Sequence, residues 1–175
     1  MTDIEHKIEN AIKKGVHYND LNINQINGFK KAIAHFGSFD YINSYKEEAF
    51  LWAIKNQQEY LVDYLIPFQM KLNNLTSLLK LAFENKSIFN KFILYLVNSD
   101  ILDDNEAATD TLKFLVIYND IDNLRFVLES KPNIHLSKNV LSTAINRCGG
   151  YDNSERIDTA QYIWEKYFEQ YPELP

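Results

Sequence analysis

Cys148 has the strongest potential for chemistry, because it is the only cysteine and lies beside Arg147 in the segment "RCGGYDNSE". A neighbouring cation can stabilise a thiolate, which is the nucleophilic form of cysteine. Nucleophilic catalysis also requires a base and a residue that orients the base. No pattern in the sequence supplies such a pair, so we expect Cys148 to be a free thiol without a catalytic role.

The remaining residue types that could bind metal or transfer protons are scattered. None of the histidines has a second ligand at a spacing that would place both on one helix face; they are His6, His17, His35 and His135. The acidic segment "DILDDNEAATD" lacks the glycine and the terminal glutamate of an EF-hand loop. No glycine-rich phosphate-binding motif occurs. We therefore predict no metal, no cofactor and no enzymatic activity.

The elements that carry these residues are predicted to be helices. The chain of 175 residues is 46% hydrophobic, which is enough to bury a core. It contains only 5 glycines and 4 prolines. Sandwiches and barrels made of strands need many turns, so this scarcity predicts an all-α fold.

Charge and hydropathy restrict the partners. A net charge of −6 argues against direct binding of nucleic acid, which requires a basic surface. No apolar run is long enough to span a membrane, and the first residues lack the apolar region of a signal peptide. A single cysteine is typical of a reducing compartment. We expect a cytoplasmic protein, or one in the host-cell cytosol if it is a viral or bacterial effector.

The segment "NDIDNLRFVLES", from Asn119 to Ser130, belongs to a pattern that recurs along the chain. A polar start that can cap a helix is followed by apolar residues at helical spacing. Similar segments begin at Asn56, Asn85 and Glu155. In the last of them the predicted inner face comprises Ile157, Ala160 and Trp164. Alignment of the central aromatic residue of each segment gives positions about 30 residues apart: Tyr64, Phe92, Phe126 and Tyr162.

A short apolar helix is predicted before each of these segments. The four shorter helices start at Glu47, Thr76, Thr109 and Lys138. Their predicted inner positions recur at a similar interval: Ala53, Ala82, Val116 and Ala144. The repeating unit is therefore helix, turn, helix and loop. A period of this length is typical of a solenoid whose units bury apolar faces against their neighbours.

The domain organisation follows from this repeat. We predict one α-helical repeat domain over residues 1–175, with a capping helix and linker at 1–27, helix pairs over 28–170 and a tail at 171–175. The first helix would turn Ile4, Ile8, Ala11 and Ile12 inward. Terminal repeats are commonly atypical, which accounts for the less regular N-terminal quarter.

The helix pairs resemble ankyrin repeats, in particular divergent ones. In "TSLLKLA", Thr76, Leu78 and Ala82 are similar to the threonine, leucine and second alanine of that family's first-helix motif. The second helices, such as "NDIDNLRFVLE", resemble its second-helix pattern. The resemblance covers roughly residues 28–170 and implies a solenoid of about four to five degenerate ankyrin-like helix-turn-helix repeats.

The sequence also departs from the family. Ser77 and Leu79 replace the proline and histidine of the motif, and Asn56, Asn85 and Asn119 stand where the family has a glycine between helices. Asparagine is the next-best residue for a left-handed conformation. The family's hairpin-tip motif is absent, so plain loops are expected between units. Another α-solenoid or an irregular bundle remains an alternative.

A solenoid offers an extended surface, so we predict a module that binds another protein, of unknown identity. First-helix residues expected to point outward, and hence to bind the partner, are Lys55, Lys80, Glu84, Lys113, Tyr118 and Arg147. We expect the abundant aromatic residues, Trp52 among them, to fill the seams between helices. Two alternatives are an acidic inhibitor or immunity-type protein that neutralises a basic partner, and a helical protein that binds a small molecule.

Overall fold

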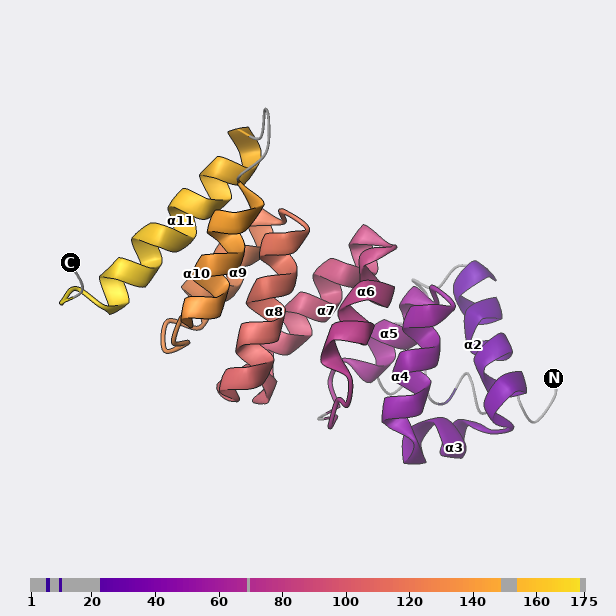
Figure 1. Ribbon diagram of the computed structural model, residues 1–175. Helices are drawn as coiled ribbons and strands as arrows, with labels where there is room; N and C mark the ends of the chain where they lie inside the picture. The colour runs from indigo at the N-terminus through magenta and orange to yellow at the C-terminus, as the bar shows by residue number, and fades with distance from the viewer. Residues whose placement is uncertain (1–5, 7–9, 11–22, 69, 149–153, 174–175) are drawn as a thin grey trace. The chain divides into compact units, whose positions relative to one another are not determined.

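The computed structural model describes residues 6, 10, 23–68, 70–148 and 154–173. Within these residues every regular element is a helix and no strand occurs, which confirms the all-α prediction (Figure 1). None of the described helices combines the length and the apolar character that crossing a membrane would require. The predicted inward residues of the N-terminal helix, Ile4, Ile8, Ala11 and Ile12, lie outside the described residues.

The chain divides into two compact units. Of the described residues, those up to Asn73 together with Lys80–Phe92 form unit 1. Unit 2 consists of Asn74–Leu79 and the residues from Ile93 onward. Helices α6 (Leu75–Phe83) and α7 (Lys86–Asn98) therefore contribute residues to both units.

Unit 1 is built around a group of helices that share one apolar core. These helices are α2 (Ile23–Phe36), α3 (Phe39–Ser44), α4 (Lys46–Lys55) and α5 (Glu59–Leu65). Helix α2 packs against the other three, and α4 packs against α5. Phe29 and Phe50 are fully buried, and the rings of Phe50 and Phe92 lie 5.7 Å apart. Burial of these rings, together with aliphatic side chains such as Ile42 and Leu61, stabilises this unit.

Unit 2 contains two helix pairs and a short 3₁₀ turn. Its elements are η2 (Ile101–Asp103), α8 (Asn105–Ile117), α9 (Ile121–Ser130), α10 (Lys138–Arg147) and α11 (Ser154–Gln170). Helix α8 packs against α9 and against α10, and α10 packs against α11. The first helix of one pair thus contacts the first helix of the next pair.

The turn between α4 and α5 reverses the chain through one left-handed residue. Gln57 has φ = 53°, and its N–H donates to the carbonyl of Ile54 at 3.2 Å. The N–H of Gln58 donates to the carbonyl of Ala53 at 2.8 Å. This pair of hydrogen bonds is a Schellman motif, which satisfies the last carbonyl groups of a helix.

The turn between α8 and α9 has the same geometry. Asn119 has φ = 55° and donates its N–H to Val116 at 3.1 Å, while Asp120 donates to Leu115 at 2.9 Å. The side chain of Asp120 then caps α9 by accepting the N–H of Asn123 at 3.2 Å. The polar start of the recurring segment therefore ends one helix and caps the next.

The prediction for the residue that replaces glycine in these turns is correct only at Asn119. In the α4–α5 turn the left-handed residue is Gln57, because α4 extends to Lys55 and Asn56 serves as its C-cap. Asn85 is not among the described residues with positive φ. Its side chain caps α7 by accepting the N–H of Ile88 at 3.3 Å. Between α2 and α3 a glycine, Gly37, does adopt the left-handed conformation, with φ = 82°.

The inner positions of the first helices are predicted correctly. Ala53, Ala82, Val116 and Ala144 are all buried. The aromatic alignment of the second helices is wrong, because Phe92 is fully buried whereas Phe126 is 38% exposed. Counting from the N-cap explains the difference: Phe92 stands seven residues after Asn85, and Phe126 six after Asp120. One residue rotates a side chain by about 100° around a helix.

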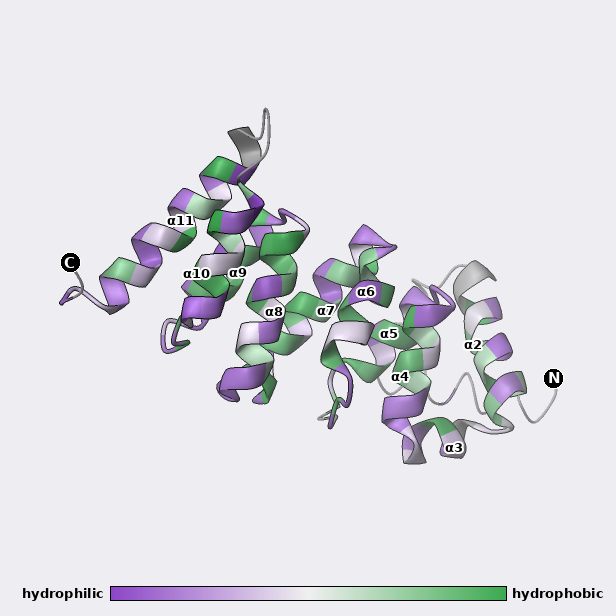
Figure 2. Ribbon diagram, viewed as in Figure 1, coloured by the Kyte–Doolittle hydropathy of each residue, from purple (hydrophilic) through white to green (hydrophobic). Residues whose placement is uncertain are grey.

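The predicted inner face of α11 is also wrong. Ile157 and Trp164 are 52% and 49% exposed, whereas Thr159, Ile163 and Tyr167 are buried. The hydroxyl of Thr159 donates to the side-chain oxygen of Asn119 at 2.7 Å. A polar contact with the preceding turn therefore helps to set the face of α11, which hydrophobicity alone could not reveal. Figure 2 shows more hydrophobic colouring along α7 than along α11.

The connection from α9 to α10 is an extended segment held by α11. Gln170 donates its side-chain N–H to the carbonyl of Ile134 at 2.7 Å and accepts the N–H of Leu136 at 2.8 Å. Ile134 and Leu136 are buried. A plain loop, as predicted, is thus kept in place by one amide side chain and two apolar anchors.

Candidate functional site

A group of aromatic side chains in unit 1 reaches the solvent, where helices α2, α3 and α4 meet. We call it the aromatic surface, and its members are His35, Phe36, Tyr41, Tyr45 and Trp52. Phe36 and Trp52 are half-buried, and the other three are exposed. Helix α3 connects the C-terminal end of α2 to the N-terminal end of α4, which brings these residues together (Figure 1).

Ring contacts run through the whole aromatic surface. Trp52 stacks on His35 with ring centroids 5.2 Å apart and meets Phe36 edge to face at 5.7 Å. Phe36 stacks on Tyr41 at 5.9 Å, and Tyr41 on Tyr45 at 4.3 Å. Contacts at these distances contribute beyond the area that the rings bury, so the arrangement is held in place before any partner arrives.

Tyr45 alone separates α3 from α4, and its N–H donates to the carbonyl of Tyr41 at 2.9 Å. In the sequence, Tyr41, Tyr45 and Trp52 are four and seven residues apart, which is helical spacing. The backbone of Tyr45 is not helical, with φ = −119° and ψ = 53°, so α3 and α4 are separate helices, and the stacking of Tyr41 on Tyr45 joins their side chains. The spacing of these three residues was visible in the sequence. The search for catalytic groups passed over it, because His35 is the one member of the aromatic surface with a typical catalytic side chain.

Charged side chains lie next to these rings. Glu48 lies three residues after Tyr45 and four before Trp52, hence on the same face of α4, and it is exposed. Asp40 precedes Tyr41 and is exposed as well. Two lysines, Lys55 and Lys31, stand three residues after Trp52 and four before His35. Lys46 follows Tyr45 directly, but its Nζ atom lies 4.0 Å from the centre of the Phe68 ring. The remaining charges divide the surface into a tyrosine end with Asp40 and Glu48 and an end with Lys55 and Lys31 that carries Trp52 and His35.

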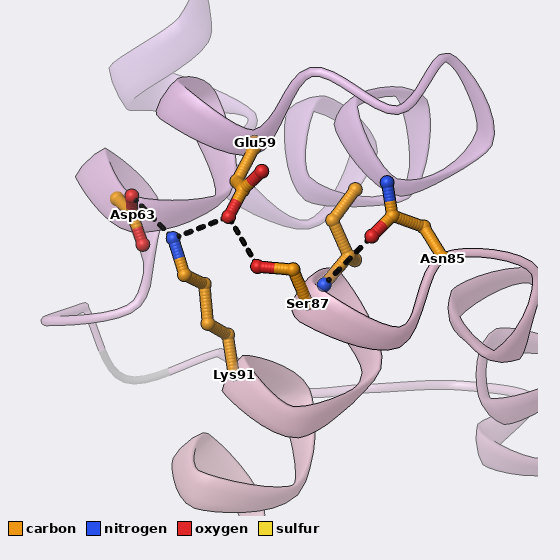
Figure 3. Close-up of polar contacts among 6 residues, drawn as sticks. Glu59, Asp63, Asn85, Ser87 and Lys91 are labelled. Atoms are coloured by element: carbon orange, nitrogen blue, oxygen red, sulfur yellow. Dashed lines mark hydrogen bonds and ion pairs between the residues drawn. The ribbon is translucent and has the colours of Figure 1, made fainter.

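A second polar cluster in unit 1 joins α5 to α7 (Figure 3). The Nζ atom of Lys91 lies 2.8 Å from both Glu59 Oε1 and Asp63 Oδ2. The hydroxyl of Ser87 donates to the same Glu59 oxygen. Hydrogen bonds from Lys91 and Ser87 lower the pKa of Glu59 despite partial burial. Partial burial opposes the charge of Lys91, but its hydrogen bonds to Asp63 and Glu59 outweigh that effect and raise its pKa.

These pKa shifts decide what the cluster can do. A serine nucleophile needs a neighbouring base that accepts its proton near neutral pH. Glu59, with a lowered pKa, is a weak base, and Lys91, with a raised pKa, remains protonated. The contacts therefore join α5 to α7 as a polar clamp.

Unit 2 contains a cavity of about 550 Å³ beside the N-terminal end of α10. Lys138, Tyr167, Gln170 and Tyr171 contribute to its wall. The amide of Gln170 is already committed to the backbone of Ile134 and Leu136. Glu173 lines it as well, so together with Lys138 the wall carries both charges and is otherwise mixed in polarity.

The other described residues that could bind a metal or react do not lie together in one site. Within the described part of the chain no three His, Cys, Asp or Glu side chains could jointly hold a metal ion. Cys148 is a free, half-buried thiol whose Sγ contacts the carbonyl of Ile145 at 3.0 Å. His17 and the glycines that follow Cys148 lie outside the described residues.

The residues predicted to bind a partner lie at or near the C-terminal ends of first helices. Lys55, Lys80 and Glu84 belong to unit 1, and the other three belong to unit 2. Five are exposed and Lys113 is half-buried; the exposed members are Lys55, Lys80, Glu84, Tyr118 and Arg147. Only Lys55 borders the aromatic surface. Their role in binding stays a prediction.

The expectation that Trp52 fills a seam is only partly correct, because one side of its ring packs on His35 and Phe36 while the residue remains half-buried.

Comparison with known proteins found no family model, no curated protein and no solved structure that matches this chain.

Proposed function

We propose that this protein is a non-catalytic module that binds another protein, built from degenerate ankyrin-like helix pairs. Three features support the repeat. The α4–α5 and α8–α9 turns share one hydrogen-bond pattern, and the inner positions of the first helices are buried. In addition, α8 and α10, the first helices of consecutive pairs, pack against each other.

The aromatic surface is the observation that carries the binding function. Tyrosine and tryptophan are enriched at the centres of protein interfaces, where they contribute much of the binding energy. Here their rings are held by mutual contacts, so little conformational entropy is lost on binding. Contiguous exposed apolar patches mark sites of interaction, and three of these five rings are exposed while the other two are half-buried.

Co-purification with a matched pair of variants tests this function. Tyr45 and Trp164 are 48% and 49% exposed, but Tyr45 belongs to the aromatic surface and Trp164 lies on α11 in unit 2. We expect one stoichiometric partner to be retained by the wild type and by Trp164→Ala. The same partner should be lost from Tyr45→Ala and from Trp52→Ala.

Circular dichroism and thermal unfolding of each variant establish that it is folded. A partner retained equally by all variants would place binding elsewhere on the chain. A folded wild-type protein that retains no partner at low or at high salt would contradict the proposed function.

A further inference from the structure

Glu48 stands among the rings of the aromatic surface and not at its edge. It follows Tyr45 by three residues and precedes Trp52 by four on the exposed face of α4. Among the described residues neither Glu48 nor Asp40 takes part in an ion pair. Glu47, by contrast, accepts the N–H of Lys71 at 2.8 Å and so has a structural role. Tyr41 is stacked on both Phe36 and Tyr45, so the ring that the tyrosine end offers to a partner is that of Tyr45, which is 48% exposed and lies beside the two carboxylates that form no ion pair within the described residues.

Cations bind such ring faces, because the face of an aromatic ring carries partial negative charge. The chain itself shows this contact elsewhere. Lys46 Nζ lies 4.0 Å above the ring of Phe68, and the guanidinium of Arg125 lies 5.1 Å from the ring of Tyr162. Within the described residues no lysine or arginine of the chain covers Tyr41, Tyr45 or Trp52 in this way.

The two ends of the surface suit different side chains. Lys55 and Lys31 would repel a cation from the end that carries Trp52 and His35. Leu51, which is 44% exposed, adds apolar area next to Trp52. The tyrosine end, with Glu48 and Asp40, attracts positive charge instead. The net charge of −6 acts in the same direction at longer range.

We infer that the tyrosine end of the aromatic surface receives an arginine or lysine side chain of a partner polypeptide, while Trp52 and Leu51 contact an apolar side chain next to it. This inference rests on the proposed function and adds the chemistry of the partner. A basic partner also agrees with the alternative that the protein neutralises a basic target.

Selection of a random linear-peptide display library on the immobilised full-length chain tests the inference and does not require the partner to be identified first. We expect the enriched peptides to combine arginine or lysine with an adjacent apolar residue. Synthetic copies should bind about tenfold more weakly to Tyr45→Ala, as expected for a central aromatic residue. They should bind about threefold more weakly to Glu48→Gln, and this difference should shrink at high salt.

Two control variants separate the surface from general effects. Asp122→Asn removes another exposed carboxylate from the first turn of a helix, α9, and changes the net charge by the same amount as Glu48→Gln. Trp164→Ala removes an exposed ring of unit 2. Both controls should bind the selected peptides like the wild type.

The possible results distinguish the two proposals. Peptides that bind the aromatic surface but lack arginine and lysine, or that tolerate Glu48→Gln, would overturn the cationic inference and leave the binding function standing. If no peptide is enriched, or if binding is indifferent to Tyr45→Ala and Trp52→Ala, the inference fails. The co-purification experiment then decides separately whether the protein binds a partner.

Discussion

The α4–α5 turn of unit 1 and the α8–α9 turn of unit 2 share a backbone but differ in side-chain support. Both pass through a left-handed residue, Gln57 or Asn119. Asn119 also accepts a hydrogen bond from Thr159, and Asp120 caps α9. Gln58 makes no such cap, and its side chain donates to the carbonyl of Asn56.

This difference shows which part of a degenerate repeat is imposed by the backbone. Two helices that reverse direction must satisfy the last carbonyl groups of the first helix, so the turn geometry recurs. The side chains around the turn can vary as long as the apolar face is buried. In unit 1, aromatic rings on α2, α3 and α4 lie at the surface. In unit 2, the side chains of the turn instead make polar contacts with α11.

The largest expected effect comes from the two phenylalanines that the sequence aligns. Phe92→Ala should lower the free energy of unfolding by about 3–5 kcal/mol, because it empties a fully buried site. Phe126→Ala should cost less than about 1 kcal/mol, since that ring is partly exposed. Urea unfolding of each variant measures the difference. Similar losses for both would mean that the N-cap register does not govern burial.

A moderate effect is expected at the N-caps of α5 and α9. Asp120→Ala should destabilise the protein by about 0.5–2 kcal/mol, because the N–H of Asn123 loses its acceptor. Gln58→Ala should change the free energy of unfolding by less than about 0.5 kcal/mol, since no side-chain cap is present. Thermal unfolding of the two variants side by side checks this, and equal shifts in Tm would contradict the asymmetry between the turns.

The smallest effect concerns the Glu59–Lys91 clamp and depends on pH. The pKa of Glu59 is lowered on folding, so its contribution is complete above its unfolded value of about 4.5 and is lost as the pH falls through the folded value. The pKa of Lys91 is raised, so its contribution is present below about 10.5 and disappears at higher pH. Both groups are about one-third exposed, which keeps the total below about 1 kcal/mol.

Urea unfolding of wild type and Glu59→Gln as a function of pH measures this contribution. The two curves should differ at neutral pH and converge in acid. Asp103→Asn, which breaks the pair between Lys131 and the more exposed Asp103 in unit 2, serves as the control and should matter less. Curves for Glu59→Gln that stay parallel to the wild type down to strong acid would exclude the clamp as a source of stability.

Much of the local structure could be read from the sequence. Asp120 was recognisable as a cap, since a short side-chain oxygen acceptor stood directly before an apolar helical run. The small inner residues Ala53, Ala82 and Ala144 could be aligned because close helix packing leaves room for little else. The aromatic surface could have been found from the spacing of Tyr41, Tyr45 and Trp52, but its contacts with His35 and Phe36 on α2 could not.

The helical character of the chain, the pairing of most helices and the inward positions of the first helices all follow from local patterns. Periodicity and capping depend on residues that are close in the chain, so the sequence alone is enough to predict them. Three other features could be seen only in the tertiary structure. Gln57 adopts the left-handed conformation in its turn, α11 buries Thr159 instead of Trp164, and five aromatic rings come together at the surface. They depend on side chains far apart in the chain, such as Asn119 and Thr159, whose contact no local pattern encodes.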